Sequence, residues 1–206
     1  MMRTKVLVVE DQAMPRQLFE MFIGLSKKYS LADSISEAGF AESCCRRFHV
    51  DLVIMDVVMA QGMNGLEAAR SIKASFPEIR IIIVTSMPEV SYINLAKEIG
   101  VEGFWYKEVS EAPVLELMDR VMAGEIVYPE TTPVVKFGET LSTNLTDKEY
   151  AVLRAMIGGA TNTEIAEKLH ISVAAVKFHI QNILDKTGYR NRTELAVKAS
   201  ESGLVL

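Results

Sequence analysis

Residues 52–56 read Leu-Val-Ile-Met-Asp, a run of four apolar residues that ends at the carboxylate of Asp56. Short continuous apolar runs of this kind are typical of buried parallel strands. Three more such runs end at polar residues able to handle phosphate, and these residues are Glu10 with Asp11, Thr85, and Lys107. The carboxyl ends of parallel strands lie at one edge of a sheet, where open α/β folds bind their ligands. The sequence therefore predicts that these polar groups converge at one site.

The first 124 residues alternate short apolar runs with longer stretches of helical periodicity. This alternation predicts βα units around a parallel sheet. We expect strands at 5–9, 31–35, 52–55, 80–84 and 103–106, and helices at 15–28, 37–48, 66–75, 91–99 and 112–123. The first domain is thus predicted to be α/β, with a five-stranded, doubly wound parallel sheet over residues 1–124.

The chain changes character after residue 124. Residues 125–143 contain Pro129 and Pro133 and show no sustained period, which favours a linker. Beyond it, three helix-start signatures place a capping Thr or Asn three positions before a Glu, and Ser172 is a further capping candidate. These signals predict four helices at 147–157, 162–169, 173–187 and 192–202. We expect an all-α domain over residues 144–206.

Composition and charge exclude several classes of protein. The chain has 206 residues, 49% of them hydrophobic and 24% charged, which is ordinary for a soluble protein. No apolar stretch reaches the roughly 18 residues of a membrane span. The only cysteines, Cys44 and Cys45, are adjacent, so there is no disulfide framework, and we expect a cytoplasmic location.

The net charge of −5 argues against strong non-specific binding to nucleic acid. Residues 1–124 carry 13 Lys and Arg against 17 Asp and Glu, whereas residues 141–206 carry 8 against 7. Any affinity for DNA must therefore come from a local basic face of the second domain, or from pairing two copies of the chain.

The polar groups of the first domain suit phosphoryl transfer. This chemistry needs an in-line nucleophile and neutralisation of charge. Glu10, Asp11 and Asp56 offer the carboxylate oxygens that Mg²⁺ prefers, and Asp56 can act as the nucleophile. Thr85 can donate a hydrogen bond to a phosphoryl oxygen and Lys107 can balance its charge. A single Asp after a strand is usually a cap or turn former, so the argument rests on all of these groups occurring together.

With these motifs, residues 1–124 resemble the receiver domain of two-component response regulators, which has a flavodoxin-like fold. The resemblance implies that Asp56 is the phosphoacceptor, Thr85 the switch hydroxyl and Lys107 the site lysine. It also implies a metal contact from the backbone carbonyl of Val58 and a switch aromatic at Phe104, for which a core phenylalanine is the alternative. The chain departs from the family at Ala60 and Gln61, which leave the loop geometry and phosphoryl lifetime open, and at Glu108, where many receivers have proline.

Residues 162–187 have the proportions of a helix-turn-helix. If Ile165 faces Val176 across the pair, then Lys177, Phe178, Gln181 and Asn182 lie on outer faces of the second helix. A long cation with amides nearby can reach base edges and phosphates in a major groove. A four-helix packing module without a role in DNA binding is the alternative.

Residues 145–206 resemble the LuxR-type effector domain. The matching residues are Leu145, Thr146, Glu149, Val152, Leu153, Glu164, Ile165, Ala166, Leu169, Ser172, Val176, Lys177, His179, Ile183, Lys186, Arg192 and Thr193. The resemblance implies that Lys177 contacts a base or the DNA backbone, and we expect Ser172, Phe178, Gln181 and Asn182 to contribute further contacts.

As a whole, the chain resembles NarL/LuxR-type (NarL/FixJ family) response regulators. The resemblance implies a sensor histidine kinase as phosphodonor, Mg²⁺ as cofactor, promoter DNA as target and a homodimer on activation, and it admits RNA polymerase as a further partner. One alternative is a regulator of the same fold that works without phosphorylation. Another is a phosphotransferase or phosphatase enzyme with Asp56 as nucleophile, although Val58 stands where one such class of phosphatases has a second Asp.

Overall fold

The computed structural model describes residues 3–59, 62–87, 89–107, 113–202 and 204. The chain forms two compact units, one of residues 1–85 and 92–131 and the other of residues 86–91 and 132–206. The sequence departures at Ala60, Gln61 and Glu108 lie outside the described residues. Within the described part, no helix is both long enough and apolar enough to cross a membrane.

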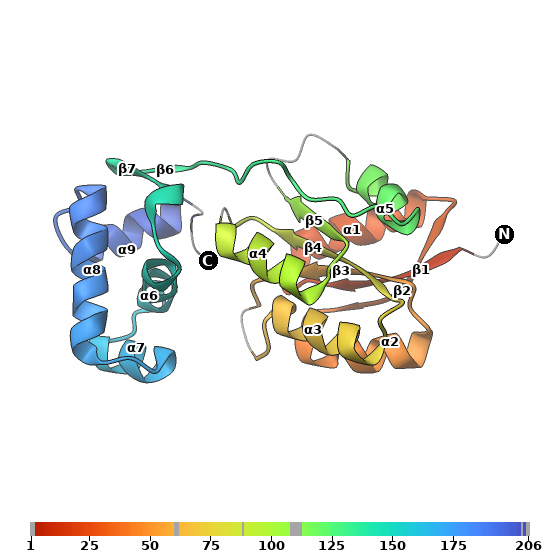
Figure 1. Ribbon diagram of the computed structural model, residues 1–206, viewed down its shortest axis with the longest axis horizontal. Coiled ribbons are helices and arrows are strands. Elements are labelled where there is room, and N and C mark those ends of the chain that lie inside the picture. The colour runs from red at the N-terminus through yellow and green to blue at the C-terminus, as the bar shows by residue number, and fades with distance from the viewer. Residues whose placement is uncertain (1–2, 60–61, 88, 108–112, 203, 205–206) are drawn as a thin grey trace. The chain divides into compact units, whose positions relative to one another are not determined.

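Five parallel strands form the sheet of the first unit, in the order β2-β1-β3-β4-β5 (Figure 1). The strands are β1 (Thr4–Val9), β2 (Tyr29–Ile35), β3 (Leu52–Asp56), β4 (Arg80–Thr85) and β5 (Gly103–Tyr106). This confirms the expected five-stranded, doubly wound sheet. After β1 the chain adds β2 on one side of β1 and then crosses to add β3 on the other side. In open α/β folds the ligand site lies at such a reversal of strand order.

Helices cover both faces of this sheet (Figure 1). On one face lie α1 (Ala13–Leu25) and α5 (Val114–Met122), and on the other lie α2 (Ala41–Phe48) and α3 (Gly65–Ser75). The right-handed crossover between β4 and β5 places α4 (Val90–Ile99) on the face of α2 and α3. Under α1 and α5, alternate strand residues such as Val8, Ile54 and Val84 form a buried core with Phe19 and Met118.

All five helices of this unit differ from the predicted bounds at one end or both, and the differences in α1 and α2 have local causes. α1 begins at Ala13 and ends at Leu25, not at 28, because the amide of Ser26 turns back to the carbonyl of Ile23 and β2 begins at Tyr29. The segment expected as a helix from 37 begins instead with a 3-10 turn, η1 (Ala38–Phe40), which contains Gly39. Glycine disfavours an α-helical interior, which is consistent with a 3-10 turn in place of the first α-helical turn.

The helices of the second unit follow their capping residues. They are α6 (Asp147–Ile157), α7 (Asn162–Leu169), α8 (Val173–Thr187) and α9 (Arg192–Glu201). Thr146 and Thr161 each form a reciprocal capping box with the Glu three residues later, while Ser172 and Asn191 cap α8 and α9. These side chains satisfy backbone amides that a helix start leaves without an intrahelical partner, so they define where each helix begins.

A short hairpin lies inside the segment that the sequence suggested was a linker. Its strands are β6 (Lys136–Phe137) and β7 (Thr140–Leu141), and the turn η2 (Ser142–Asn144) follows. Phe137 is buried and meets the ring of Tyr189 edge to face at 5.3 Å. Two-residue strands are too short to show a period of two, so the sequence carries no periodic signal for them.

Candidate functional site

Strand register brings the ends of β1, β3, β4 and β5 to one level. Val9 pairs with Met55, so Glu10 and Asp56 follow at the same height, and Asp56 pairs with Val84. On the far side, Thr85 pairs with Tyr106, which places Lys107 just beyond the end of β5. The amide of Lys107 donates to the carbonyl of Thr85 at 3.0 Å, which ties these two strand ends together.

The side chains at this edge form one compact cluster. Lys107 Nζ lies 2.5 Å from Glu10 Oε2 and 2.9 Å from Asp56 Oδ2, so one ammonium bridges two carboxylates. Glu10, Asp11 and Asp56 each offer a carboxylate oxygen, and these three atoms all lie within 4.8 Å of one another. Glu10 and Asp56 are almost fully buried, as is Thr85 at the end of β4. The structure therefore brings together four predicted groups by distance, and Thr85 by its place in the sheet.

Two further residues hold the backbone of this site, and the sequence analysis assigned them no role. Arg16 donates through Nη1 to the carbonyls of Glu10, at 2.8 Å, and Asp11, at 3.3 Å. The first residue of α3, Gly65, lies so close to β3 that a Cβ there would stand 1.7 Å from the carbonyl oxygen of Asp56. Helix propensity does not favour a glycine just after the N-cap. Its presence in the sequence was therefore the available signal that the helix backbone approaches another element closely.

Burial sets the electrostatics of the cluster. It raises the pKa of Glu10 to about 7, and the charge of Asp56 adds to this effect, while Lys107 opposes it. Burial likewise raises the pKa of Asp56, against the pull of Lys107 and of the backbone amides of Val58 and Val57. For Lys107, burial lowers the pKa, but the two carboxylates outweigh burial and raise it. Three carboxylates facing one ammonium leave negative charge that a cation would neutralise.

This donor set fits a hard divalent cation. All three acidic side chains offer oxygen ligands, which Mg²⁺ prefers over nitrogen or sulfur. Asp56 combines a carboxylate oxygen with a buried position beside Lys107, an arrangement suited to a nucleophile toward phosphorus. The pocket can thus hold a cation and offer a nucleophile in the same small volume.

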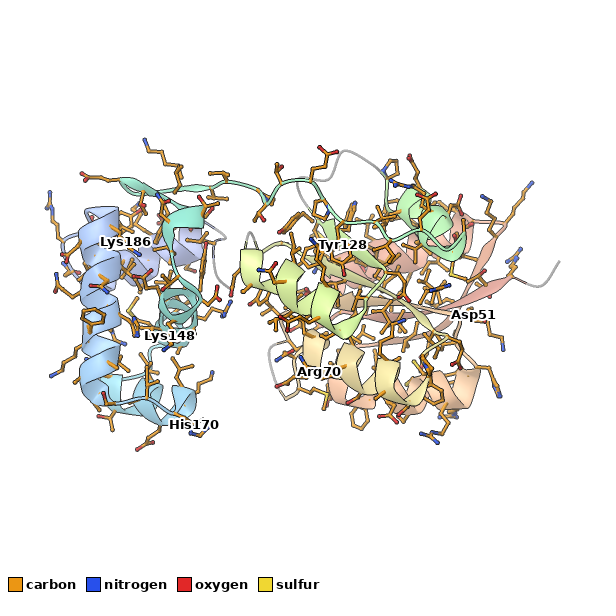
Figure 2. The ribbon with its side chains drawn as sticks, viewed as in Figure 1. Asp51, Arg70, Tyr128, Lys148, His170 and Lys186 are labelled. Carbon is orange, nitrogen blue, oxygen red and sulfur yellow. The ribbon has the colours of Figure 1, made fainter. Side chains whose placement is uncertain are left out.

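Phe104 and Val58, the two remaining predicted site residues, differ in their relation to this cluster: the backbone amide of Val58 is hydrogen-bonded to Asp56, whereas the Phe104 ring packs among other aromatic rings. Phe104 is buried on β5, where its ring meets Tyr106 edge to face at 5.2 Å and stacks with Tyr128 at 6.2 Å. Tyr128, labelled in Figure 2, donates its hydroxyl to the carbonyl of Val101 at 2.8 Å. Phe104 is therefore packed in the core in this conformation. Val58 lies half-buried two residues beyond Asp56.

In the second unit, α7 and α8 form a helix-turn-helix. The turn begins at His170, which has a left-handed backbone with φ of 52°, and the amide of Ile171 closes it on the carbonyl of Ala166 at 3.0 Å. Ile165 on α7 and Val176 on α8 are fully buried in the shared core, as the sequence predicted for this pair. Arg192 on α9 donates to the side chain of Asn162 and to the carbonyl of Ala160, which links α9 to the start of α7.

The residues predicted to contact DNA lie mostly on the exposed side of α8. Lys177 and Gln181 are exposed, Phe178 keeps 62% of its surface exposed, and Asn182 is half-buried. Ser172 is exposed at the start of α8, where its Oγ accepts from the amide of Ala175 at 3.1 Å. An exposed aromatic ring beside a lysine and an amide offers apolar and polar contacts on one helix side.

Comparison with known proteins gives a match for each unit. Residues 6–119 match the family described as response regulator receiver domain, and residues 143–199 match the bacterial regulatory proteins of the luxR family. The response regulator protein VraR of Staphylococcus epidermidis is 30% identical over an alignment 216 residues long, gaps included, which covers 99% of this chain and all of the relative. VraR of Staphylococcus aureus shows the same identity and coverage.

Solved structures show the same fold. A complex of the two-component response regulator RcsB with DNA aligns with a TM-score of 0.59 at 19% identity, covering 97% of this chain and 98% of that one. A DNA-binding response regulator of the LuxR family from Staphylococcus aureus aligns with a TM-score of 0.54 at 28% identity, covering 57% of this chain and 98% of that one.

Proposed function

Because the chain belongs to the two-component response regulators that join a receiver domain to a LuxR-type DNA-binding domain, we propose that Asp56 accepts a phosphoryl group from a sensor histidine kinase and that phosphorylation controls binding to promoter DNA. This family consists of DNA-binding transcriptional regulators and not of enzymes. The observation that carries the proposal is the convergence of Glu10, Asp11, Asp56 and Lys107 in one pocket.

Transfer exchanges one bond to phosphorus for another. A carboxylate oxygen of Asp56 attacks the phosphorus of a phosphohistidine on the kinase, the P–N bond breaks, and the imidazole leaves with its electron pair and takes up a proton. The product is an acyl phosphate on Asp56. Lys107, already 2.9 Å from Asp56, pairs with a phosphoryl oxygen, and the Thr85 hydroxyl donates to another.

Glu10, Asp11, Asp56 and the backbone carbonyl of Val58 would hold Mg²⁺. When bound, the ion supplies neutralisation of charge on the phosphoryl oxygens. The raised pKa of Glu10 reflects burial and the neighbouring Asp56, which is the environment expected before a cation arrives. A bound cation favours the ionised form of the carboxylates. The residues that would hold the metal thus belong to the same pocket that would receive the phosphoryl group.

The signal then passes from the pocket to the second domain. In the proposal, Thr85 moves toward the new phosphoryl group and Phe104 changes its packing between Tyr106 and Tyr128, which shifts a two-state receiver toward its active form. The active chain pairs with a second copy. A known structure contains two RcsB dimers bound to two parallel DNAs, and pairing would double the phosphate contacts of this weakly basic domain.

DNA is read by α8 in this proposal. Lys177, Phe178, Gln181 and Asn182 enter the major groove, and Ser172 contacts a phosphate at the start of the helix. A promoter as target and a sensor kinase as phosphodonor imply that the protein works in the cytoplasm. Binding to the promoter would bring it into contact with RNA polymerase.

Labelling with a small phosphodonor such as acetyl phosphate tests the phosphoacceptor. We predict that wild-type protein gains one phosphoryl group in the presence of Mg²⁺, as measured by intact mass, and that Asp56→Asn gains none. Asp51→Asn is the matched control, since Asp51 precedes β3 at the opposite edge of the sheet and accepts from the amide of Lys5 at 2.8 Å (Figure 2). Full labelling of Asp56→Asn would refute the assignment.

A further inference from the structure

The exposed side of α8 forms one continuous stripe. Its members are three or four positions apart, so they lie on one side of the helix. They are Ala174, Lys177, Phe178, Gln181 and Asp185, and all five are exposed. Under the proposed function, this stripe faces the base edges of the major groove. Asp185 is the one acidic member, and the sequence analysis gave it no role.

Asp185 restrains the amide of Gln181. Nε2 of Gln181 donates to Oδ1 of Asp185 at 2.8 Å, across one helical turn. An ionised carboxylate can only accept hydrogen bonds, so the chemistry of the pair decides which end of the amide faces Asp185. The nitrogen of Gln181 turns toward Asp185 and uses one of its two N–H groups there, which leaves the carbonyl oxygen Oε1 and one N–H outside the pair. Gln181 therefore offers an acceptor on the same side of α8 as Lys177 and Phe178.

We infer that Asp185 is a positioning residue that makes Gln181 read an exocyclic amine in the major groove, either N6 of adenine or N4 of cytosine. This inference rests on the proposed DNA-binding role of α8. Adenine and cytosine present an amine donor there, whereas guanine and thymine present only acceptors for hydrogen bonds. An untethered glutamine could turn its nitrogen toward those acceptors. The tether holds Nε2 toward Asp185, so Oε1 is the end of the amide that faces an incoming base edge, and a base that offers an amine donor is preferred.

Asp185 has a second effect that must be separated from the first. Its negative charge lies on the stripe that faces DNA and repels nearby phosphates, which weakens binding to any sequence. Loss of the tether changes preference at one base pair, whereas loss of charge changes affinity for all sequences alike. The substitution Gln181→Ala divides the two effects, because it removes the tethered amide and keeps the negative charge of Asp185.

The experiment selects binding sites from a pool of randomised double-stranded DNA with full-length phosphorylated protein at one salt concentration. Wild type is expected to select adenine or cytosine at one position of each half-site. Gln181→Ala and Asp185→Ala both lose that preference and keep the preferences at other positions. Asp185→Glu keeps it, because an ionised glutamate also only accepts hydrogen bonds. Of the two alanine variants, only Asp185→Ala gains affinity for all sequences.

Affinities for single sites give the size of the effect. Changing the selected base pair so that guanine or thymine faces Gln181 lowers wild-type affinity about 5- to 10-fold, as expected for one base-edge hydrogen bond. The same change costs Asp185→Ala less than about 2-fold. An unchanged preference in Asp185→Ala, or a lost preference in Asp185→Glu, overturns the inference but leaves the proposed function intact. Failure of wild type to select any sequence overturns the proposed function itself.

Discussion

Gly65 shows how one missing side chain shapes the proposed phosphoryl site. The first residue of α3 presses against β3, and a Cβ there would stand 1.7 Å from the carbonyl oxygen of Asp56. The amide of Gly65 also donates to the carbonyl of Val57 at 3.0 Å, so the backbone cannot retreat without losing this bond. Val57, directly after Asp56, is thus held by contact with the start of α3.

We predict that Gly65→Ala lowers the free energy of unfolding of the first unit by more than about 2 kcal/mol, because the added carbon forces backbone atoms apart. Trp105 is the only tryptophan of the chain, so its fluorescence follows this unit in a urea titration. Gly24→Ala is the control: Gly24 lies within α1 with no atom near its missing Cβ. It should stabilise the protein by about 0.5 to 1 kcal/mol. Equal effects of the two substitutions would contradict the close approach.

At the scale of elements, the buried carboxylate of Glu149 joins α6 to α8. Lys186 on α8, labelled in Figure 2, donates to both oxygens of Glu149, at 2.7 and 2.9 Å. Glu149 also accepts from the amide of Thr146. Burial raises the pKa of Glu149, but these hydrogen bonds outweigh burial and leave the pKa below its ordinary value of 4.5. The ionised carboxylate is therefore the form that the fold stabilises.

We predict that Lys186→Met lowers the free energy of unfolding by about 1.5 to 3 kcal/mol at neutral pH, the range for a hydrogen bond to a charged group. Because the folded pKa of Glu149 lies below 4.5, this difference is fully present above 4.5 and shrinks as pH falls through the folded value. Circular dichroism of the helices during urea unfolding measures it. Lys148→Met, at an exposed lysine on α6, should change little at any pH (Figure 2). A difference between wild type and Lys186→Met that stays constant down to acid pH would contradict the pairing.

The sequence predicted most elements because their signals are local. Capping residues such as Thr161 and Ser172 mark single positions, so three of the four helices in the second unit match the prediction at both ends. Apolar runs likewise located all five strands of the sheet, although their ends shifted by one or two residues. The hairpin of β6 and β7 escaped, since its stability comes from contacts such as Phe137 with Tyr189 rather than from a local pattern.

The candidate site was predictable for those polar residues that stand at the ends of the parallel strands. Glu10, Asp56 and Lys107 could be grouped because the carboxyl ends of parallel strands share an edge. Arg16 could not, because its contact with the carbonyls of Glu10 and Asp11 depends on how α1 approaches β1. The tie between Gln181 and Asp185 was also beyond a reading of residue types, since a surface pair four positions apart more often only adds helix stability.

At the scale of the whole molecule, the proposed function requires that chemistry in one unit changes the DNA affinity of the other. The chain carries a net charge of −5, and only residues 141–206 are slightly basic, so one copy has little electrostatic attraction for DNA. A phosphoryl group on Asp56 adds further negative charge. Any gain in DNA affinity must therefore come from a change of conformation or from pairing of two copies, not from charge.

The most direct test measures the affinity of the full-length chain for a selected DNA site, before and after treatment with a phosphodonor and Mg²⁺ at fixed salt. We predict that treatment raises the affinity of wild type by at least about 10-fold, within the usual range of coupling between two sites, and leaves Asp56→Asn unchanged. Equal affinity of treated and untreated wild type, or an equal gain in Asp56→Asn, would contradict control through Asp56 and support a regulator that works without phosphorylation.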